Sequence, residues 1–579
     1  MFNALFTKTE EYNKLAQALG SPGACALFGV PGAGRALIYA ALAQTLGRPL
    51  CIVTPGEAEA TRFAGDLNAL GITAAVFPAR DYVLRPIEGT GREYEYRRLA
   101  VLGDLVGGRL QAVCVPDEGL TQYTTPRAEF CANTRTLHPG DTLPRAELTA
   151  LLYGAGYARR DQVDGPGQFS IRGDIVDIYA PDMKQPARLE FWGDEIDTMH
   201  SFDLATQRRD EPIEKIYVSP AREVLFAQPA EAAALIRSCI KKARGKQRTA
   251  LEACTAADLA QLDGGAMPVD MDKYLTLRYP EPATLLDYFD DPLLILEEPA
   301  SLREAARATA YRRREEFSAL MEDGALAPGL DKLYTEAGWL WAQAAAHCTL
   351  CAENFARSMP DISLKAIVNA PAHTLPAWGG EVAALLEDIQ PLCSGGAAVT
   401  VMAGTPRAAA GLAADLRTKG LQVTTDAAAA GTAGLVQVLP GQLSAGCSLP
   451  FARYAVFTAR AFGVSSAQKK KKRSKDALNS LSEITIGDLV VHQSHGIGRY
   501  AGIQRMTVQG VQKDYLRIEY DKKDVLYVPV TQLDLLSRYT APGDSDNVKL
   551  SHLGGTDWAK TRKKVKAATE QMAKELIEL

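Results

Sequence analysis

The sequence has few residues of the kinds that build disulfide frameworks, metal sites or membrane spans. Its ten cysteines are scattered over 579 residues, and only Cys348 and Cys351 stand in C-x-x-C spacing, without a second pair to complete a tetrahedral zinc site. We expect both cysteines, with His347 beside them, to be helix or core residues. No apolar run approaches the roughly 18 residues that cross a bilayer, and charged residues begin at Lys8, too early for a signal peptide. These absences predict a cytoplasmic protein without a membrane partner.

The chain also lacks an excess of positive charge. Its 64 Lys and Arg against 69 Asp and Glu give a formal net charge of −5, so any affinity for DNA must be local. The basic run Lys469–Lys475 is most simply a solvated linker, although it could touch phosphate. With 47% hydrophobic and 23% charged residues, the composition is that of a globular protein, and the length suggests roughly four domains.

The pattern of apolar residues predicts a multi-domain α/β and α+β protein. Between residues 24 and 125, short apolar runs alternate with helical patterns, as in a parallel sheet. Strands separated by turn residues follow in residues 128–212, an α+β insertion, and helical stretches in residues 213–345 are expected to pack back on the first sheet. The strands and helices expected in these parts are Ala24–Phe28, a helix from about Arg35, Pro49–Val53, Glu57–Leu70, Ala74–Phe77, Ser170–Tyr179, Ala187–Trp192, Pro229–Lys242 and Leu302–Met321.

Three further parts complete the expected organisation. A second, smaller α/β domain occupies residues 360–465, with strands at Ala398–Met402, Gln422–Thr424, Leu435–Leu439 and Tyr454–Thr458 and a helix at Arg407–Lys419. The basic linker spans residues 466–482. A compact β unit follows in residues 483–545, in which Leu516, Ile518 and Tyr520 alternate with Arg517 and Glu519 as in a half-buried strand. Its strands are expected at Asp488–Gln493, Gly498–Val508, Asp514–Tyr520 and Val525–Leu533, and a helix begins at Trp558.

A degenerate P-loop lies between the first strand and the first helix of the sheet. A working P-loop needs a lysine for the β- and γ-phosphates and a Ser or Thr for Mg²⁺. Here Gly29, Gly32 and Gly34 are present, but Arg35 and Ala36 replace the lysine and the hydroxyl. We therefore expect a tight strand-to-helix turn rather than a functioning nucleotide site. Asp117-Glu118, which resembles a helicase acidic pair, is expected to be a loop at a strand end.

An arginine and a tryptophan share one face of an expected strand in the insertion. Alternation from residue 188 places Arg188, Glu190 and Trp192 on one face and Leu189 and Phe191 on the other. If the second face points inward, Arg188 and Trp192 stand together on the surface, which is a typical composition for an interface hot spot. Local packing is the alternative explanation of such a stripe.

Two regions of the sequence resemble a known family. The run from Arg172 to Asp203 resembles the second domain of UvrB, the excision-repair helicase that verifies DNA damage, and more closely the matching domain of bacterial transcription-repair coupling factors. Residues 77–82 (FPARDY) and 97–99 (RRL) are also similar to that family. The degenerate P-loop and the short segment after Tyr82, which leaves no room for UvrB's damage-probing hairpin, favour a coupling factor over UvrB.

The β unit carries the second part of the resemblance. Residues 486–492, 495–502, 514–516 and 526–530 look like the CarD-like RNA-polymerase-interacting domain of the same family. Leu553-Gly554-Gly555 with Trp558 is similar to the helix that leads into the family's translocase motor, and the motor itself is missing from this sequence. The resemblance implies UvrB-like domain 1a in residues 1–127, UvrB-like domain 2 in 128–212, UvrB-like domain 1b in 213–345, a small CarD/Tudor-like β-barrel in 483–545 and the start of the motor helix in 546–579.

The resemblance also implies partners for this chain. UvrA would bind at Arg172, Arg188 and Trp192, where the family commonly has Phe in place of Trp192. We expect Arg188→Ala to weaken UvrA binding with thermal stability nearly intact. The β subunit of RNA polymerase would bind at Ile503, Arg505 and Met506 on an exposed strand edge, although a Met on a strand is usually a core residue.

The resemblance further implies that the chain acts as an adaptor in nucleotide excision repair. Upstream DNA, ATP and Mg²⁺ would belong mainly to the motor, so this chain should be a monomer with no cofactor, metal, catalytic residue or ATPase activity of its own. Two rival functions remain open. A UvrB-like ATP-dependent DNA-damage enzyme would bind ATP at Gly32, Gly34 and Arg35. A CarD-like DNA-binding transcription regulator would show affinity that falls steeply with salt.

Overall fold

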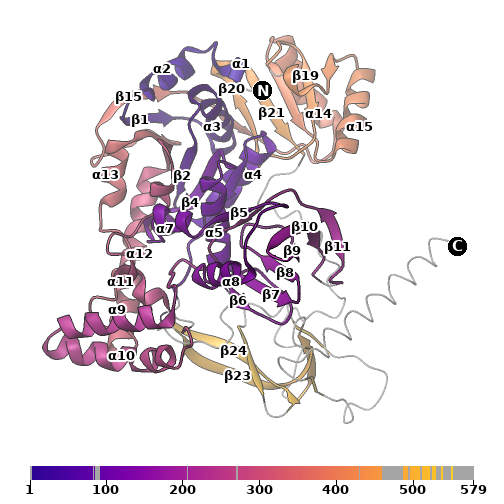
Figure 1. Ribbon diagram of the computed structural model, residues 1–579. Coiled ribbons are helices and arrows are strands. Elements are labelled where there is room, and N and C mark those ends of the chain that lie inside the picture. The colour runs from indigo at the N-terminus through magenta and orange to yellow at the C-terminus, as the bar shows by residue number, and fades with distance from the viewer. Residues whose placement is uncertain are drawn as a thin grey trace. The chain divides into compact units, whose positions relative to one another are not determined.

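The computed structural model divides the chain into two compact units, residues 1–464 and 465–579, which are described separately (Figure 1). The structure describes residues 3–82, 84, 92–204, 206–268, 271–429, 431–459, 487–492, 496–508, 511–521, 524–529, 536–538 and 550–551. The expected basic linker and the expected helix after Trp558 lie outside these residues. None of the described helices is both long and apolar enough to cross a lipid bilayer.

A seven-stranded parallel sheet forms the centre of the first unit, as the alternating pattern predicted. The central strands of this sheet are almost continuously apolar and buried because helices cover both faces of the sheet. The strand order is β15 (Leu364–Asn369), β1 (Gly23–Phe28), β14 (Cys348–Glu353), β13 (Leu293–Glu297), β2 (Leu50–Thr54), β4 (Ala112–Pro116) and β3 (Ala74–Val76). The helices on one face are α1 (Asn3–Phe6), α2 (Glu10–Ala18), α3 (Gly32–Leu46) and α4 (Glu57–Ala69), and those on the other include α5 (Glu93–Val106), α7 (Arg127–Ala132), α12 (Pro299–Glu322) and α13 (Trp339–Ala346).

The sheet differs from the expectation in two places. Strands β14 and β15 lie beyond residue 345, where the returning domain was expected to end, and they flank β1 on its two sides. Cys348 and Cys351 of β14 are buried, which agrees with the expectation that they are helix or core residues. The pair Asp117-Glu118 begins the short helix α6 (Asp117–Thr121) rather than a loop. Asp117 is buried there, while Glu118 is ion-paired with Arg312 of α12 at 2.8 Å.

The insertion contains a six-stranded sheet of its own. Its strand order is β11 (Arg209–Pro212), β10 (Glu195–Phe202), β9 (Ala187–Trp192), β8 (Ile175–Tyr179), β7 (Gln168–Arg172) and β6 (Ala158–Arg159). One face packs on α8 (Arg145–Gly154) and on the two-stranded ribbon of β5 (Arg135–Leu137) and β12 (Ile216–Val218). In β9, Leu189 and Phe191 are buried in this core and Trp192 is exposed, which confirms the predicted alternation.

A helical arm follows the insertion. Helices α9 (Pro229–Lys242) and α10 (Gly245–Asp263) lie side by side (Figure 1) and share an apolar core with η1 (Met271–Tyr274) and α11 (Leu275–Arg278). The chain then passes η2 (Leu285–Tyr288) and returns to the first sheet as β13.

Buried ion pairs join three segments that are far apart in the sequence. Arg98 of α5 and Glu223, which follows the insertion, are both fully buried, and Arg98 Nε donates a hydrogen bond to Glu223 Oε1 at 2.7 Å. Arg80 approaches the same carboxylate at 3.3 Å and pairs with Asp272 of η1 at 2.8 Å. Removing one of these charges would leave its partner buried and uncompensated, so the network holds the exit of the insertion against the first sheet.

The second α/β sheet is mixed, with strand order β16 (His373–Leu375), β20 (Gly446–Leu449), β21 (Tyr454–Thr458), β17 (Ala398–Met402), β19 (Val436–Leu439) and β18 (Val423–Thr424). Its helices are α14 (Val382–Ser394) and α15 (Pro406–Thr418), so the expected elements are present within a few residues. The sheet shares a core with α3 and α4. Buried Asp66 of α4 accepts hydrogen bonds from Ser444 N and Oγ, both at 2.6 Å. These bonds link α4 of the first sheet to the domain of the second α/β sheet.

The second unit contains a five-stranded antiparallel sheet. Its strand order is β25 (Val525–Pro529), β24 (Val511–Glu519), β23 (Gly496–Val508), β22 (Leu489–His492) and β26 (Leu536–Arg538). Leu516, Ile518 and Tyr520 are buried, as the alternation predicted. A Cβ at Gly498 would lie 2.5 Å from Ile518 Cγ2, so a glycine permits this close approach. Closure of the sheet into a CarD/Tudor-like barrel remains a prediction.

Candidate functional site

The side chain of Arg35 at the degenerate P-loop points into the protein. Its guanidinium is 2% exposed and pairs with Glu297 at the end of β13 and with Glu298, the latter at 2.5 Å. Arg35 Nε donates a hydrogen bond to the carbonyl oxygen of Val30 at 2.7 Å. Burial by itself would lower the pKa of Arg35, but the two carboxylates, chiefly Glu297, raise it above its ordinary value. This arginine is therefore a buried cation that is already neutralised, and it does not face a phosphate.

Protein atoms also fill the space around the glycines of the loop. A Cβ at Gly34 would lie 2.8 Å from Cys447 Sγ of the second α/β sheet, and a Cβ at Gly32 would lie 3.0 Å from Arg62 Nη1. Ala36 is fully buried in the core. Helix α3 begins at Gly32, so the predicted tight strand-to-helix turn is observed. From Gly32 to Ala36 the loop has neither the side chains nor the open surface that a bound triphosphate requires.

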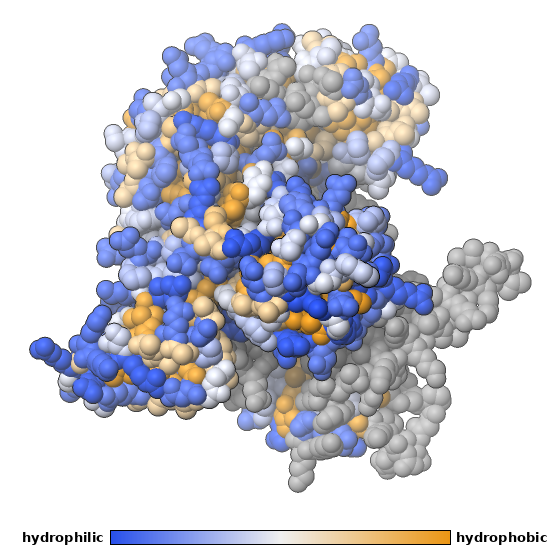
Figure 2. All heavy atoms as spheres, viewed as in Figure 1, coloured by the Kyte–Doolittle hydropathy of each residue, from blue (hydrophilic) through white to orange (hydrophobic). Residues whose placement is uncertain are grey.

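Trp192 is the most exposed large hydrophobic residue among those that the structure describes. It is the last residue of β9, before the turn at Gly193, and it is 83% exposed. The face of the first unit seen in Figure 2 is largely hydrophilic, with hydrophobic side chains in small groups. A tryptophan this exposed has no role in the core of its own domain, and it is the residue type that most often anchors protein interfaces.

A buried carboxylate organises the arginines on the same face of this sheet. Asp177, in the middle of β8, is 0% exposed and pairs with both Arg172 of β7 and Arg188 of β9. Arg188 donates from Nε to Oδ1 at 2.7 Å and from Nη2 to Oδ2 at 2.9 Å, and Arg172 Nη2 donates to Oδ2 at 2.5 Å. We call these three residues the Asp177 ion cluster. Hydrogen bonding to Asp177 raises the pKa of Arg188, so this cation is fixed in its charged form.

The two arginines differ in how far their side chains are accessible to a partner protein. The side chain of Arg172 is 44% exposed, whereas that of Arg188 is 11% exposed. The guanidinium of Arg188 also lies over the ring of Phe202 at 4.7 Å and donates a hydrogen bond to the carbonyl oxygen of Gln207 at 3.2 Å. Arg188 therefore lies on the same face as Trp192, as expected, but it is only partly exposed. The expectation that Arg188→Ala would leave stability nearly intact does not fit this geometry, because the substitution would strip a buried carboxylate of two hydrogen bonds.

Sequence reasoning missed Asp177, although a signal was present. The strand reads Ile175-Val176-Asp177-Ile178-Tyr179, with a carboxylate at the centre of an apolar strand. An acidic residue in such a position is rarely buried without a cation, so the pattern predicts a basic partner on a neighbouring strand. The register aligns Asp177 with Arg188 on β9, but the sequence does not state which strands are neighbours.

The second candidate surface lies on β23 and β24. The first part of β23 pairs with β22 through Gly496–Arg499, while Ile503–Val508 pairs only with β24 within the described part of the chain. Figure 1 shows these two strands as a long ribbon. The predicted polymerase-contact residues Ile503, Arg505 and Met506 lie on this segment, opposite Leu516, Asp514 and Lys513 in the register. The side chains of the three predicted residues lie outside the described parts.

Comparison with protein families assigns a class to each of these two regions. Residues 136–224 match the UvrB interaction domain, and this match covers most of the insertion and the whole Asp177 ion cluster. Residues 484–540 match the CarD-like/TRCF RID domain, which covers the antiparallel sheet. The chain is thus a multi-domain protein that combines a match to the UvrB interaction domain with a match to the CarD-like/TRCF RID domain.

Curated relatives match nearly the whole chain. The transcription-repair-coupling factor of Bacillus subtilis is 29% identical over 568 residues, which cover 96% of this chain and 48% of that protein. The corresponding protein of Staphylococcus aureus is 25% identical over 597 residues, covering 100% of this chain and 50% of that protein. The sequence is therefore similar over nearly its whole length to transcription-repair-coupling factors, and it spans about half the length of these relatives.

Proposed function

We propose that this chain is an adaptor that binds the β subunit of RNA polymerase and recruits UvrA for nucleotide excision repair. Two family matches support the proposal, one for each partner, on separate parts of the chain. The observation that carries it is Trp192, which stands 83% exposed on the sheet face that also presents Arg172, within the UvrB interaction domain. The domain boundaries expected from the sequence are retained as part of the proposal, with the first sheet extended to include β14 and β15.

On the UvrA side, the residues have different roles. Trp192 would be the apolar anchor and Arg172 the partner-facing cation, because both are accessible. Arg188 would act as a positioning residue, since Asp177 holds it at 11% exposure. Asp177 also fixes Arg172 before a partner arrives, which reduces the entropy that binding must overcome.

On the polymerase side, the segment Ile503–Val508 pairs on one side only among the strands that the structure describes. Such an edge offers backbone donors and acceptors to an added strand, as in β-augmentation. Met506 and Ile503 would supply apolar contacts and Arg505 a charged contact. In a longer protein that carries a translocase, ATP-driven movement on upstream DNA would act on a polymerase that is held at this site.

The UvrA surface is tested by titrating the whole chain with UvrA. We expect Trp192→Ala to weaken binding by about 30-fold or more, the size of a hot-spot loss near 2 kcal/mol. Tyr311→Ala is the matched control because Tyr311 is 69% exposed on α12, outside the matched domain. Equal affinity of the Trp192→Ala variant and the unsubstituted chain would remove Trp192 from the interface.

The polymerase surface is tested by a pull-down with the isolated β subunit. Met506→Arg places a charge on the segment where an added strand would pack, so we expect retention of the β subunit to be lost. UvrA binding of the same variant is the control for folding of the rest of the chain. If Met506→Arg retains as much β subunit as the unsubstituted chain does, the polymerase interface does not lie at this segment of β23.

A further inference from the structure

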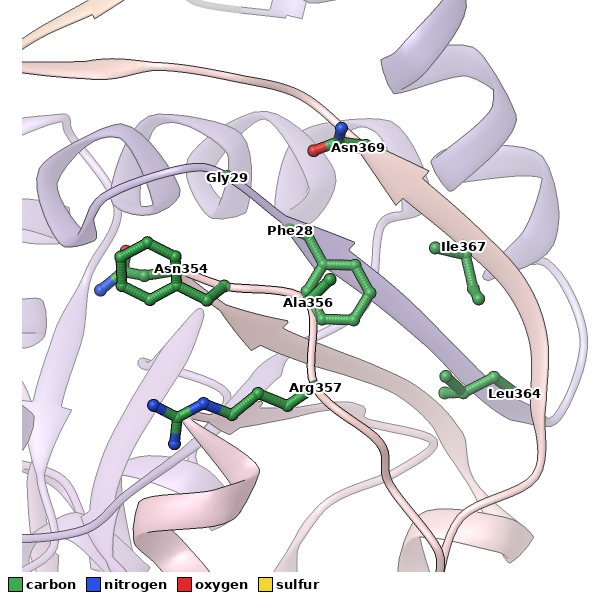
Figure 3. A pocket seen from close by; sticks show the side chains of 9 residues that line it. Phe28, Gly29, Asn354, Ala356, Arg357, Leu364, Ile367 and Asn369 are labelled. Atoms are coloured by element: carbon green, nitrogen blue, oxygen red, sulfur yellow. The ribbon is translucent and has the colours of Figure 1, made fainter.

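A pocket of about 580 Å³ opens at the carboxyl ends of β1 and β14, beside the start of the degenerate P-loop (Figure 3). Phe28 at the end of β1 and Leu364 and Ile367 of β15 form its apolar side. The segment after β14, which includes Asn354, Phe355 and Arg357, forms the other side. The pocket is distinct from the two surfaces discussed above, since it lies on the first sheet.

The topology of the sheet explains why a crevice is present here. After β1 the chain turns into α3, which packs on one face of the sheet. After β14 the chain passes to the opposite face, where Met359 and Ile362 are buried, before it pairs as β15 on the far side of β1. Connections that leave neighbouring parallel strands toward opposite faces open a crevice at the carboxyl ends, which is where such sheets bind ligands.

The pocket has one charged group. Among the described residues that line it, Arg357 is the only charged one, and no ion-pair partner is recorded for its side chain within the described parts of the chain. The acidic Asp361 nearby in sequence is paired with Arg303 at 2.6 Å, and Asn354 is oriented by a 3.0 Å hydrogen bond from Arg35. An exposed, unpaired guanidinium beside an apolar wall suits a ligand with an apolar group next to a carboxylate.

The openness of the pocket indicates how large the ligand is. Phe355 is 74% exposed and Ile367 is 53% exposed, so a small molecule would leave much of its surface in water. Strand β15 is the edge of the sheet and pairs with β1 alone among the described strands. A polypeptide could continue past the pocket over these side chains and along the free edge.

We propose that this pocket docks an extended acidic segment of a partner protein. A large apolar side chain of the segment lies against Phe28, Leu364 and Ile367, a neighbouring carboxylate pairs with Arg357, and the backbone runs beside β15. This would be a third docking surface of the chain, independent of the UvrA and polymerase surfaces.

The test uses fluorescence anisotropy of labelled peptides with the whole chain. The probe is an eight-residue peptide with a central Leu-Phe pair flanked by Asp, and its match has Lys in place of Asp. We expect the acidic peptide to bind about ten-fold more tightly than the basic one and Arg357→Glu to reverse that preference. Ile367→Ser should weaken the acidic peptide about five-fold or more, because it removes the apolar wall.

Matched variants keep the result specific. Arg314→Glu and Tyr311→Ser change an exposed arginine and an exposed aromatic residue on α12 and should leave peptide binding unchanged. Trp192→Ala should also leave it unchanged, which separates this site from the proposed UvrA surface.

Four results would overturn the proposal. The first is that the acidic peptide does not saturate the chain up to about 1 mM, and the second is that Arg357→Glu binds the acidic peptide as tightly as the unsubstituted chain. The third is that free N-acetylphenylalanine competes with the labelled peptide as strongly as the unlabelled peptide does. The fourth is that sedimentation shows a dimer of the chain that Ile367→Ser abolishes. The third would make the pocket a small-molecule site, and the fourth would assign it to a second copy of the chain.

Discussion

Replacing Arg188 with alanine should destabilise the insertion, because Asp177 would remain buried with fewer donors. Asp177 is 0% exposed and receives two hydrogen bonds from Arg188 and one from Arg172. Breaking a buried ion pair by removing one partner costs about 3–5 kcal/mol, and the remaining Arg172 offsets part of that loss. We therefore expect a loss of about 2 kcal/mol in the stability of this domain.

Hydrogen exchange of backbone amides in β7, β8 and β9 measures this loss inside the whole chain. A change of about 2 kcal/mol corresponds to roughly 30-fold faster exchange through local opening. Arg237→Ala is the matched control because it breaks an ion pair with Asp263 whose side chains are 47% and 53% exposed, so exchange in its surroundings should change little. In the double variant Arg188→Ala/Asp177→Ala the two losses should be less than additive. Unchanged exchange in Arg188→Ala would refute the structural role of the Asp177 ion cluster.

Three further predictions concern the first sheet. In a urea titration, Gly34→Ala should lower the free energy of unfolding by about 1–3 kcal/mol, because its Cβ would lie 2.8 Å from Cys447 Sγ. The control is Gly65→Ala in α4, whose Cβ meets no atom within 4 Å and which should be neutral or stabilising. Burial raises the pKa of Asp117 to about 6, so its protonated form favours the folded state; the resulting stabilisation is full below pH 4 and is lost as the pH rises to about 6. The stability of Asp117→Asn relative to the unsubstituted chain should therefore improve between pH 4 and pH 7, and a constant difference would contradict this assignment. Equilibrium dialysis with ATP and Mg²⁺ should detect no ATP binding at the degenerate P-loop. Saturable ATP binding that Arg35→Ala abolishes would instead support the rival function of a UvrB-like ATP-dependent enzyme.

Much of the local structure was predictable because it depends on residues close together in the sequence. The continuous apolar runs of β1 and β2 indicated strands buried on both faces, and the alternation in β9 placed Leu189 and Phe191 inward. The missing lysine and hydroxyl of the P-loop were visible in residues 35 and 36 alone. Side-chain chemistry and the two-residue period of a strand fix such features without reference to the rest of the chain.

Only the tertiary structure decided which distant residues meet. It placed β14 and β15 on either side of β1, neutralised Arg35 with carboxylates 262 and 263 residues away, and paired the partly buried Arg188 with the buried Asp177. It also brought Cys447 onto the P-loop glycine Gly34. The sequence pattern predicts the direction in which a side chain points from its own strand or helix. Whether that side chain is exposed also depends on which residues, distant in the sequence, pack against it. For this reason the exposed Trp192 was predictable, and the low exposure of Arg188, on the same face of the same strand, was not.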